Sequence, residues 1–167
     1  RHGAVSVLQY QQEGYLPSAL LNYLVRLGWS HGDQEVFTLD EMIQYFDIKD
    51  VNKSASAFNP EKLLWLNQQH IMQAPLDVLV TGLREQLALL DVHVEDQLLL
   101  EGVANILRER AKTLKEMAQT GLYFFREFEA YEEKSAKKNL TPEVLPIVDA
   151  LLQSFQALPQ WRSVDIH

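Results

Sequence analysis

The sequence predicts a mainly α-helical protein, and two observations lead to that prediction. Apolar residues recur at spacings of three and four along most of the 167 residues. Helix-starting signals precede these runs, either a capping residue followed by proline or a capping residue with glutamate three positions later. The chain is 47% hydrophobic and 23% charged, as in an ordinary globular protein, and its lack of cysteine excludes disulfide scaffolds and thiol chemistry.

Two helices are expected before residue 30. Ser6 is a favourable N-cap for a short helix that ends at Gly14, because glycine tolerates a left-handed cap. Pro17 fits the first position of a second helix, which ends at Gly28. Leucines and valine fill most of the circumference of this second helix, so we expect it to be buried and central, with Trp29 packed back against it.

A capping box formed by Thr38 and Glu41 starts the third expected helix. Residues 35–37, just before it, are β-prone and too short for a helix. The sequence therefore allows a short two-stranded ribbon in which these residues pair with Ala4 and Val5.

Three helices follow in the middle of the chain. The Asn-Pro pair at 59–60 repeats the cap-plus-proline start and opens a helix that reaches Ile71. Pro75 bounds the next helix, whose leucines and valine recur from residue 76 to residue 90. The same pattern returns at 99–107.

The last third of the chain begins with a second capping box, Thr113 with Glu116. An aromatic cluster follows at 123–128, and the Thr-Pro pair at 141–142 starts the last expected helix, which ends before Pro159. We place a boundary at residue 72, which gives a compact N-terminal unit, 1–72, and a helical C-terminal unit, 73–167.

The net charge of −8 argues against unspecific binding to polyanions, but the charge is unevenly distributed. The densest basic stretch contains Arg108, Arg110, Lys112 and Lys115, interrupted among charged residues only by Glu109. It lies where one expected helix ends and the next begins, so its side chains could reach a phosphate backbone or a base edge. The alternative is a solvated helix end whose cations complement the helix dipole.

Other polar candidates are weaker. Lys53 and Lys62 flank a turn of small residues, 54–57, that would let another backbone approach closely. Trp65 could stack on a base, although its position between leucines favours the core. Three further lysines are expected to be solvated surface charge: Lys134, Lys137 and Lys138.

No catalytic or metal-binding set is recognisable in the sequence. The chain has five histidines, His2, His31, His70, His93 and His167. They lie far apart and have no partners at ligand spacing, so we predict no metal site. Glycine-rich phosphate loops and serine nucleophile elbows are absent as well. An independent hydrolase therefore has no support.

Several segments, in order, resemble bacterial glutamyl-tRNA synthetases in the part that follows the second class I signature loop. The segments that carry the resemblance are Arg1–Ala4, Gly14–Pro17, Leu21–Leu24, Leu27–Ser30, Glu35–Thr38, Lys53–Asn59, Lys62–Asn67 and Arg110–Met117. The resemblance covers nearly the whole chain and is most specific at 14–30 and 58–67.

The resemblance implies a segment of an enzyme that activates glutamate with ATP and esterifies it to its cognate tRNA. The nucleotide-binding domain and the lysines of the signature loop would precede Arg1, so Arg1 and His2 are expected to be the tail of that loop, close to ATP in the intact protein. The intact enzyme would use ATP and Mg²⁺. This chain alone is expected to bind no cofactor and to be inactive.

The resemblance also implies two RNA-binding parts. Residues 1–72 would be a stem-contact domain, and residues 73–167 the first helical anticodon-binding subdomain, truncated at its C-terminal end because the family continues into a second one. Arg110 matches an arginine that helps to read the anticodon, and its planar fork suits a base edge. The other expected RNA contacts are Arg108, Lys112 and Lys115 beside it, and Lys53, Lys62 and Asn67 on the stem side.

The expected partners are the cognate glutamate tRNA and the missing catalytic domain and second anticodon-binding subdomain of the same protein. We expect a cytoplasmic monomer without a membrane role. The alternative from another class is a helical protein-interaction module, in which Trp29, Trp65 or the aromatic residues at 123–128 lie exposed as a groove.

Overall fold

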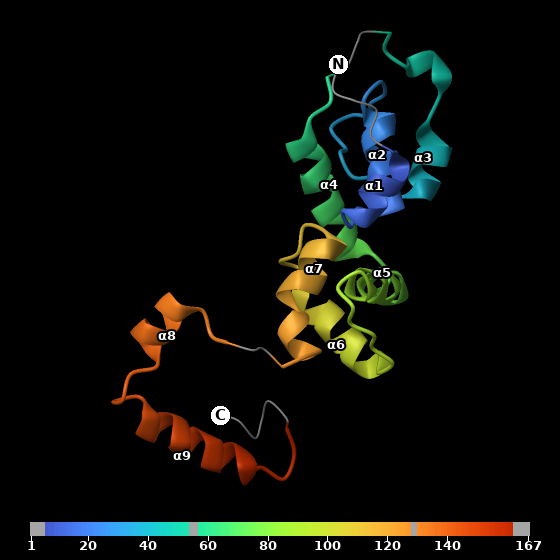
Figure 1. Cartoon of the computed structure of the whole chain (residues 1–167). Helices are drawn as coiled ribbons and strands as arrows, with labels where there is room; N and C mark the ends of the chain where they lie inside the picture. The colour runs from blue at the N-terminus through green and yellow to red at the C-terminus, as the bar shows by residue number, and fades with distance from the viewer. Residues whose placement is uncertain (1–5, 54–56, 128–129, 162–167) are drawn as a thin grey trace. The chain divides into compact units, whose positions relative to one another are not determined.

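The computed structural model describes residues 6–53, 57–127 and 130–161, and its regular structure is helical, which confirms the mainly α fold class (Figure 1). The chain forms two compact units, one ending at Glu127 and one beginning at Phe128. The first contains α1 (Val7–Gln12), α2 (Pro17–Arg26), α3 (Leu39–Tyr45), α4 (Pro60–Gln73), α5 (Leu76–Ala88), α6 (Gln97–Leu107) and α7 (Leu114–Thr120), with short 3-10 turns at Ile48–Asp50 and Leu122–Phe124. The second contains α8 (Glu133–Asn139) and α9 (Leu145–Gln156).

The helices of the first unit begin where local signals place them. The Ser6 hydroxyl caps α1, and the Asn59 side chain accepts a hydrogen bond from an N–H of the first turn of α4. Thr38 and Glu41 form a complete capping box at the start of α3. Gly14, after α1, adopts φ +80°, a conformation that residues with a Cβ rarely adopt. These four local predictions are confirmed.

Helices α2, α3 and α4 form the N-terminal part of the first unit, with α2 packed along α4. Two small apolar clusters hold them together: Tyr23 with Leu63 and Leu66, and Trp29 with Phe37 and Met42. Trp29 is buried, as expected from the sequence.

A buried polar group stabilises the same part of the unit. The Asn22 side chain on α2 donates to the Glu35 carbonyl at 3.1 Å and accepts from the Phe37 N–H at 2.8 Å. Its Oδ1 also lies 3.0 Å from Nε2 of His70 on α4. Since this oxygen can only accept, the imidazole nitrogen is the donor. The loop before α3 is thus fixed to both α2 and α4.

Helices α5, α6 and α7 enclose the largest core, which includes Leu83, Leu100 and Met117. This core continues without interruption into Leu16 and Ile71, which belong to the N-terminal part. The boundary expected at residue 72 therefore lies inside one compact unit. The contacts divide the chain after residue 127 instead, and a division into domains 1–72 and 73–167 stays a prediction.

Helix α2 is less buried than its sequence predicts. Leu21 and Leu24 are exposed, although Ala19 and Tyr23 on the same helix are buried. The neighbours of α2 leave the side with Leu21 and Leu24 uncovered, so leucines around most of the circumference do not make a central helix here. The prediction of a buried central helix is wrong for this reason.

The short ribbon is not seen among the described residues. Residues 35–37 run as an irregular segment, and the expected partners Ala4 and Val5 lie outside the described part of the chain. Within that part, the β-type pairing is a single antiparallel bridge between His31 and Gln34.

The second unit consists, in its described part, of the two helices α8 and α9. Helix α8 was not expected from the sequence, and its N-cap Glu132 accepts hydrogen bonds from two N–H groups of the first turn. Lys137 pairs with Glu133 on the exposed surface of α8, in keeping with solvated charge. Helix α9 begins at Leu145, later than the Thr-Pro signal at 141–142, because residues 142–144 form a turn.

The environment of His70 predicts a pH dependence of stability. Burial lowers the pKa of His70 below its ordinary value of 6.5, so the unfolded chain binds more protons than the folded chain as the pH falls through that value. The free energy of unfolding should therefore decrease between pH 7 and pH 5, by at most about 1.4 kcal/mol per pH unit.

Denaturant titrations at several pH values would measure this dependence. His70→Gln should flatten the profile in that window, because the carboxylates with lowered pKa titrate below their ordinary 4.5. Equal slopes for the parent chain and the variant would contradict the assignment to His70.

Candidate nucleic-acid interface

The basic stretch of the sequence forms the connection between α6 and α7, residues 108–113, here called the basic loop. The N–H groups of Arg110 and Ala111 both donate to the Leu107 carbonyl, at 3.0 and 2.9 Å. Thr113 then serves as the N-cap of α7. Backbone hydrogen bonds to the Leu107 carbonyl fix the start of the loop, and the side-chain cap of Thr113 fixes its end.

Arg108 turns back onto the end of α4. Its Nη2 donates to the carbonyls of Met72 at 2.9 Å and Ala74 at 2.7 Å, and a longer contact of 3.4 Å reaches the Ile71 carbonyl. The last carbonyls of a helix lack partners within the helix, and a cation there also complements the helix dipole. The guanidinium of Arg108 is thus engaged in holding the turn between α4 and α5.

Arg110 and Lys112 present free charge at the surface. Both side chains are exposed, and no hydrogen bond or ion pair with another described residue engages their charged groups. The backbone of Lys112 is nevertheless held on both sides: its N–H donates to Glu116 at 2.8 Å, and its carbonyl accepts from Asn67 at 2.7 Å. The loop therefore offers two available cations on a fixed backbone.

Two of the other candidate lysines are paired with carboxylates. Lys115 lies 2.9 Å from Glu13, and Lys62 lies 2.7 Å from Glu35, which is also 3.1 Å from Arg26. The hydrogen bond from Lys62 holds the pKa of Glu35 below its ordinary value, against a smaller opposing effect of burial. Such partly exposed pairs contribute little stability, and phosphate could compete for these cations.

Trp65 is exposed on α4, with 41% of its surface accessible. The expectation that it belongs to the core is wrong, because the buried leucines of α4 occupy the opposite face. Nζ of Lys62 lies 5.6 Å from the centre of its ring. One turn further along α4, the Gln68 side chain donates to the Glu109 carbonyl at 3.4 Å, so this face of the helix meets the basic loop.

The remaining candidates are placed as follows. Asn67 is fully buried, and among the described residues its amide bonds only to backbone groups, so it offers no group to RNA. Lys53 is exposed next to residues 54–56, which lie outside the described residues. Arg1 and His2, expected near ATP, lie outside them too.

The structure also bears on a metal site, a membrane-spanning helix and an aromatic groove. Among the described residues, no cluster of three His, Asp or Glu side chains could hold a metal ion. The same residues contain no helix long and apolar enough to cross a membrane. The aromatic groove of the interaction-module alternative loses Trp29, which is buried, whereas Tyr123 is exposed.

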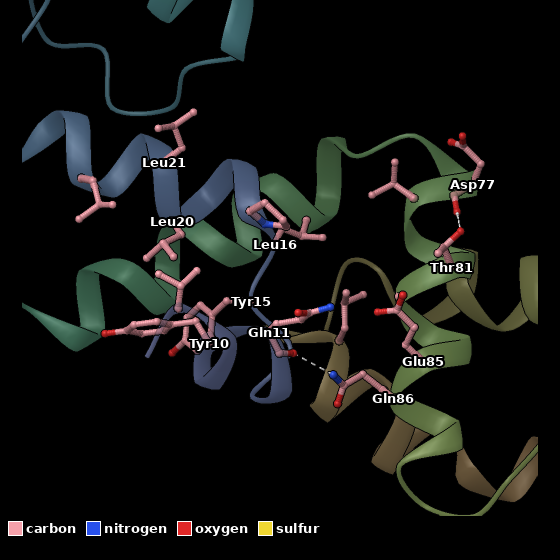
Figure 2. Close-up of a pocket in the computed structure, with 16 residues that line it drawn as sticks. Tyr10, Gln11, Tyr15, Leu16, Leu20, Leu21, Asp77, Thr81, Glu85 and Gln86 are labelled. Carbon is pink, nitrogen blue, oxygen red and sulfur yellow. Dashed lines mark hydrogen bonds between the residues drawn. The ribbon is translucent and has the colours of Figure 1, made fainter. Parts of the chain in front are cut away.

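An apolar groove of about 640 Å³ lies between α2 and α5 (Figure 2). Leu21 and the neighbouring leucines of α2 line one side, and the carboxylates of Asp77 and Glu85 on α5 lie at the other. Gln86 also lines the groove and donates to the Gln11 carbonyl at 3.1 Å (Figure 2). Because carboxylates repel phosphate, the groove does not belong to the candidate interface.

Comparison with known protein families identifies the family of this chain. The family described as "Anticodon binding domain" matches residues 78–167, which include the basic loop. The chain belongs to this anticodon-binding family. A second family, "tRNA synthetases class I (E and Q), catalytic domain", matches residues 1–65.

Curated relatives agree with both matches. Glutamate–tRNA ligase 2 of Halorhodospira halophila is 56% identical over all 167 residues, and glutamate–tRNA ligase 1 of Alkalilimnicola ehrlichii is 55% identical over the same length. The chain spans only 35% and 36% of the length of these two relatives.

A solved structure is similar as well. The crystal structure of a glutamate tRNA ligase from Elizabethkingia meningosepticum in complex with its amino acid superposes with a TM-score of 0.77, at 32% identity, over 90% of this chain and 30% of that chain. The resemblance to glutamyl-tRNA synthetases stated from the sequence is thereby confirmed.

Neighbouring arginines of the basic loop should differ in their effect on stability. Arg108→Ala removes the partner of the α4 carbonyls and should lower the free energy of unfolding by about 1–2 kcal/mol. Arg110→Ala, at an exposed position where no other described residue engages the side chain, should change it by less than about 0.5 kcal/mol. Urea titrations of both variants would measure the difference, and equal losses would contradict the capping role of Arg108.

Proposed function

We propose that this chain is a tRNA-binding segment of a glutamate–tRNA ligase. In this proposal it contacts the anticodon loop of the tRNA through its basic loop. The observation that supports the proposal most directly is the free charge of Arg110 and Lys112 on a loop whose backbone is fixed. An acidic protein that binds RNA must concentrate its available cations locally, and this loop does so.

The two cations have different tasks in this proposal. Arg110 donates through its planar fork to the edge of an anticodon base, because the bases of a single-stranded loop are unstacked and accessible. Lys112 contacts a phosphate as a point charge, which adds affinity without reading sequence.

The stem side is assigned to the exposed face of α4 and the loop before it. Trp65 offers a flat apolar surface for a ribose or base, with Lys62 beside it for a phosphate. Lys62 would exchange Glu35 for that phosphate, and Lys53 would add a further phosphate contact. Lys115, on the first turn of α7 after the basic loop, would exchange Glu13 in the same way.

The activity belongs to the whole protein in this proposal. The whole ligase would attach glutamate to its cognate tRNA, with ATP supplying the activation of the carboxylate and Mg²⁺ accompanying the ATP phosphates. Arg1 and His2 would lie near the ATP in the whole protein. This chain alone is inactive, and the cytoplasm is the compartment in which the ligase would act as a monomer.

A salt titration of binding tests the proposed function. The chain should bind glutamate tRNA more tightly than a copy with a substituted anticodon, and the logarithm of both affinities should fall linearly with the logarithm of the salt concentration. Fluorescence anisotropy of labelled tRNAs would measure both. Equal binding of the two tRNAs at every salt concentration would contradict anticodon reading by this chain.

Substitutions in the basic loop separate base reading from phosphate contact. Arg110→Ala should weaken binding of glutamate tRNA by about 1–3 kcal/mol and leave the anticodon-substituted tRNA nearly unchanged. Lys112→Ala should weaken both tRNAs equally and reduce the salt slope by about one. If Arg110→Ala also weakens both tRNAs equally, Arg110 is a phosphate contact and the reading residue lies elsewhere.

A further inference from the structure

Asn67 lies beneath the basic loop and is the only side chain among the described residues that donates to the Lys112 carbonyl. We infer that Asn67 is a positioning residue for anticodon recognition, which holds the basic loop in the conformation that presents Arg110. The inference rests on the proposed function, in which Arg110 reads a base. It replaces the direct RNA contact expected for Asn67 from the sequence.

The amide of Asn67 makes three hydrogen bonds to backbone groups from two distant segments. Its Oδ1 accepts from the Leu16 N–H at 2.8 Å, and its Nδ2 donates to the carbonyls of Gly14 at 3.4 Å and Lys112 at 2.7 Å. The side chain is fully buried. It therefore joins the start of α2 to the basic loop through α4, where Asn67 itself resides.

The chemistry of this position requires an asparagine. A carboxylate of the same shape accepts but cannot donate to the two carbonyls, and a leucine would leave three buried backbone groups without partners. Glutamine is one methylene longer and would not fit the same close-packed space without displacement of its neighbours. The bonds that hold the loop thus depend on one residue type.

Gly14 completes the same joint. Its carbonyl also accepts from the Leu114 N–H at 2.9 Å, which satisfies one of the free N–H groups at the start of α7. A Cβ at Gly14 would lie 2.3 Å from the Lys115 nitrogen and 2.8 Å from the Leu114 nitrogen, so only glycine permits this approach. The chain is therefore held at Lys112 in the basic loop and again at Leu114, where α7 begins.

Arg110 lies between two anchors that both involve α4. On one side, Arg108 bonds to the carbonyls at the end of α4, and on the other side Asn67 of α4 bonds to the Lys112 carbonyl. A short segment held at both ends has few backbone conformations left. Loss of the Asn67 bond would release one anchor only two positions from Arg110, and the backbone from which the Arg110 side chain extends would no longer be fixed.

Asn22 provides a matched control. It is also an asparagine that is fully buried, and it also joins a helix to a loop through three polar contacts, here with Glu35, Phe37 and His70. None of these three contacts involves the basic loop. Asn22→Ala and Asn67→Ala should therefore reduce stability to a similar extent while differing in their effect on RNA recognition.

The experiment compares both variants in the 167-residue chain, at a temperature where each is folded. The readout is the ratio of the affinities for glutamate tRNA and for the copy with a substituted anticodon. Asn67→Ala should reduce this ratio about tenfold, and Asn22→Ala should leave it within twofold of the parent chain. Equal ratios for the two variants would overturn the inference, because a purely structural role moves stability without moving discrimination.

Arg110→Ala, measured alongside, separates the two proposals. If Arg110→Ala abolishes discrimination while Asn67→Ala retains it, the positioning role fails and the proposed function stands. If the parent chain shows no discrimination, the proposed function fails and the inference fails with it.

Hydrogen exchange of the unmodified chain gives an answer that does not depend on the folding of a variant. The Leu16 N–H donates to Asn67, so glutamate tRNA should slow its exchange more than the anticodon-substituted tRNA does, by about threefold or more. Equal protection of this amide by both tRNAs would overturn the inference.

Discussion

The first unit depends on one buried side chain, the amide of Asn67. It supplies hydrogen-bond partners to three backbone groups that have none within a helix. The start of α2, the loop after α1 and the end of the basic loop all meet the side chain of Asn67, and an unpaired buried N–H or carbonyl there would cost about 1–3 kcal/mol. The approach of Gly14 to the start of α7 is possible only because this glycine lacks a Cβ. The two parts that the sequence suggests as separate are thereby held as one unit.

The cations of the candidate interface differ in whether other groups of the chain engage them. The chain carries a net charge of −8, and acidic side chains engage several of its lysines, such as Lys62 through Glu35 and Lys115 through Glu13. Arg108 is engaged by helix carbonyls instead. Within the basic stretch, Arg110 and Lys112 are therefore the cations whose charged groups no other described residue engages.

The candidate site was predictable in part. The density of basic residues between two expected helices was enough to locate the loop, since helix ends and charge are read from neighbouring residues. The different tasks of Arg108 and Arg110 were not predictable, because they depend on the carbonyls at the end of α4, more than thirty positions away. Trp65 shows the same limit: leucines beside it favour the core, yet the packing of α4 leaves its ring exposed.

The sequence by itself determined where most helices of the first unit begin, because a cap such as Thr38 with Glu41 satisfies free N–H groups within a single turn. It also determined the family, through motifs that stand in order along the chain. Only the tertiary structure decided which side of α2 is covered, why the expected boundary at residue 72 lies within one core, and that Asn67 faces backbone rather than solvent. These features arise from contacts between segments far apart in the chain, whose mutual arrangement local spacing does not encode.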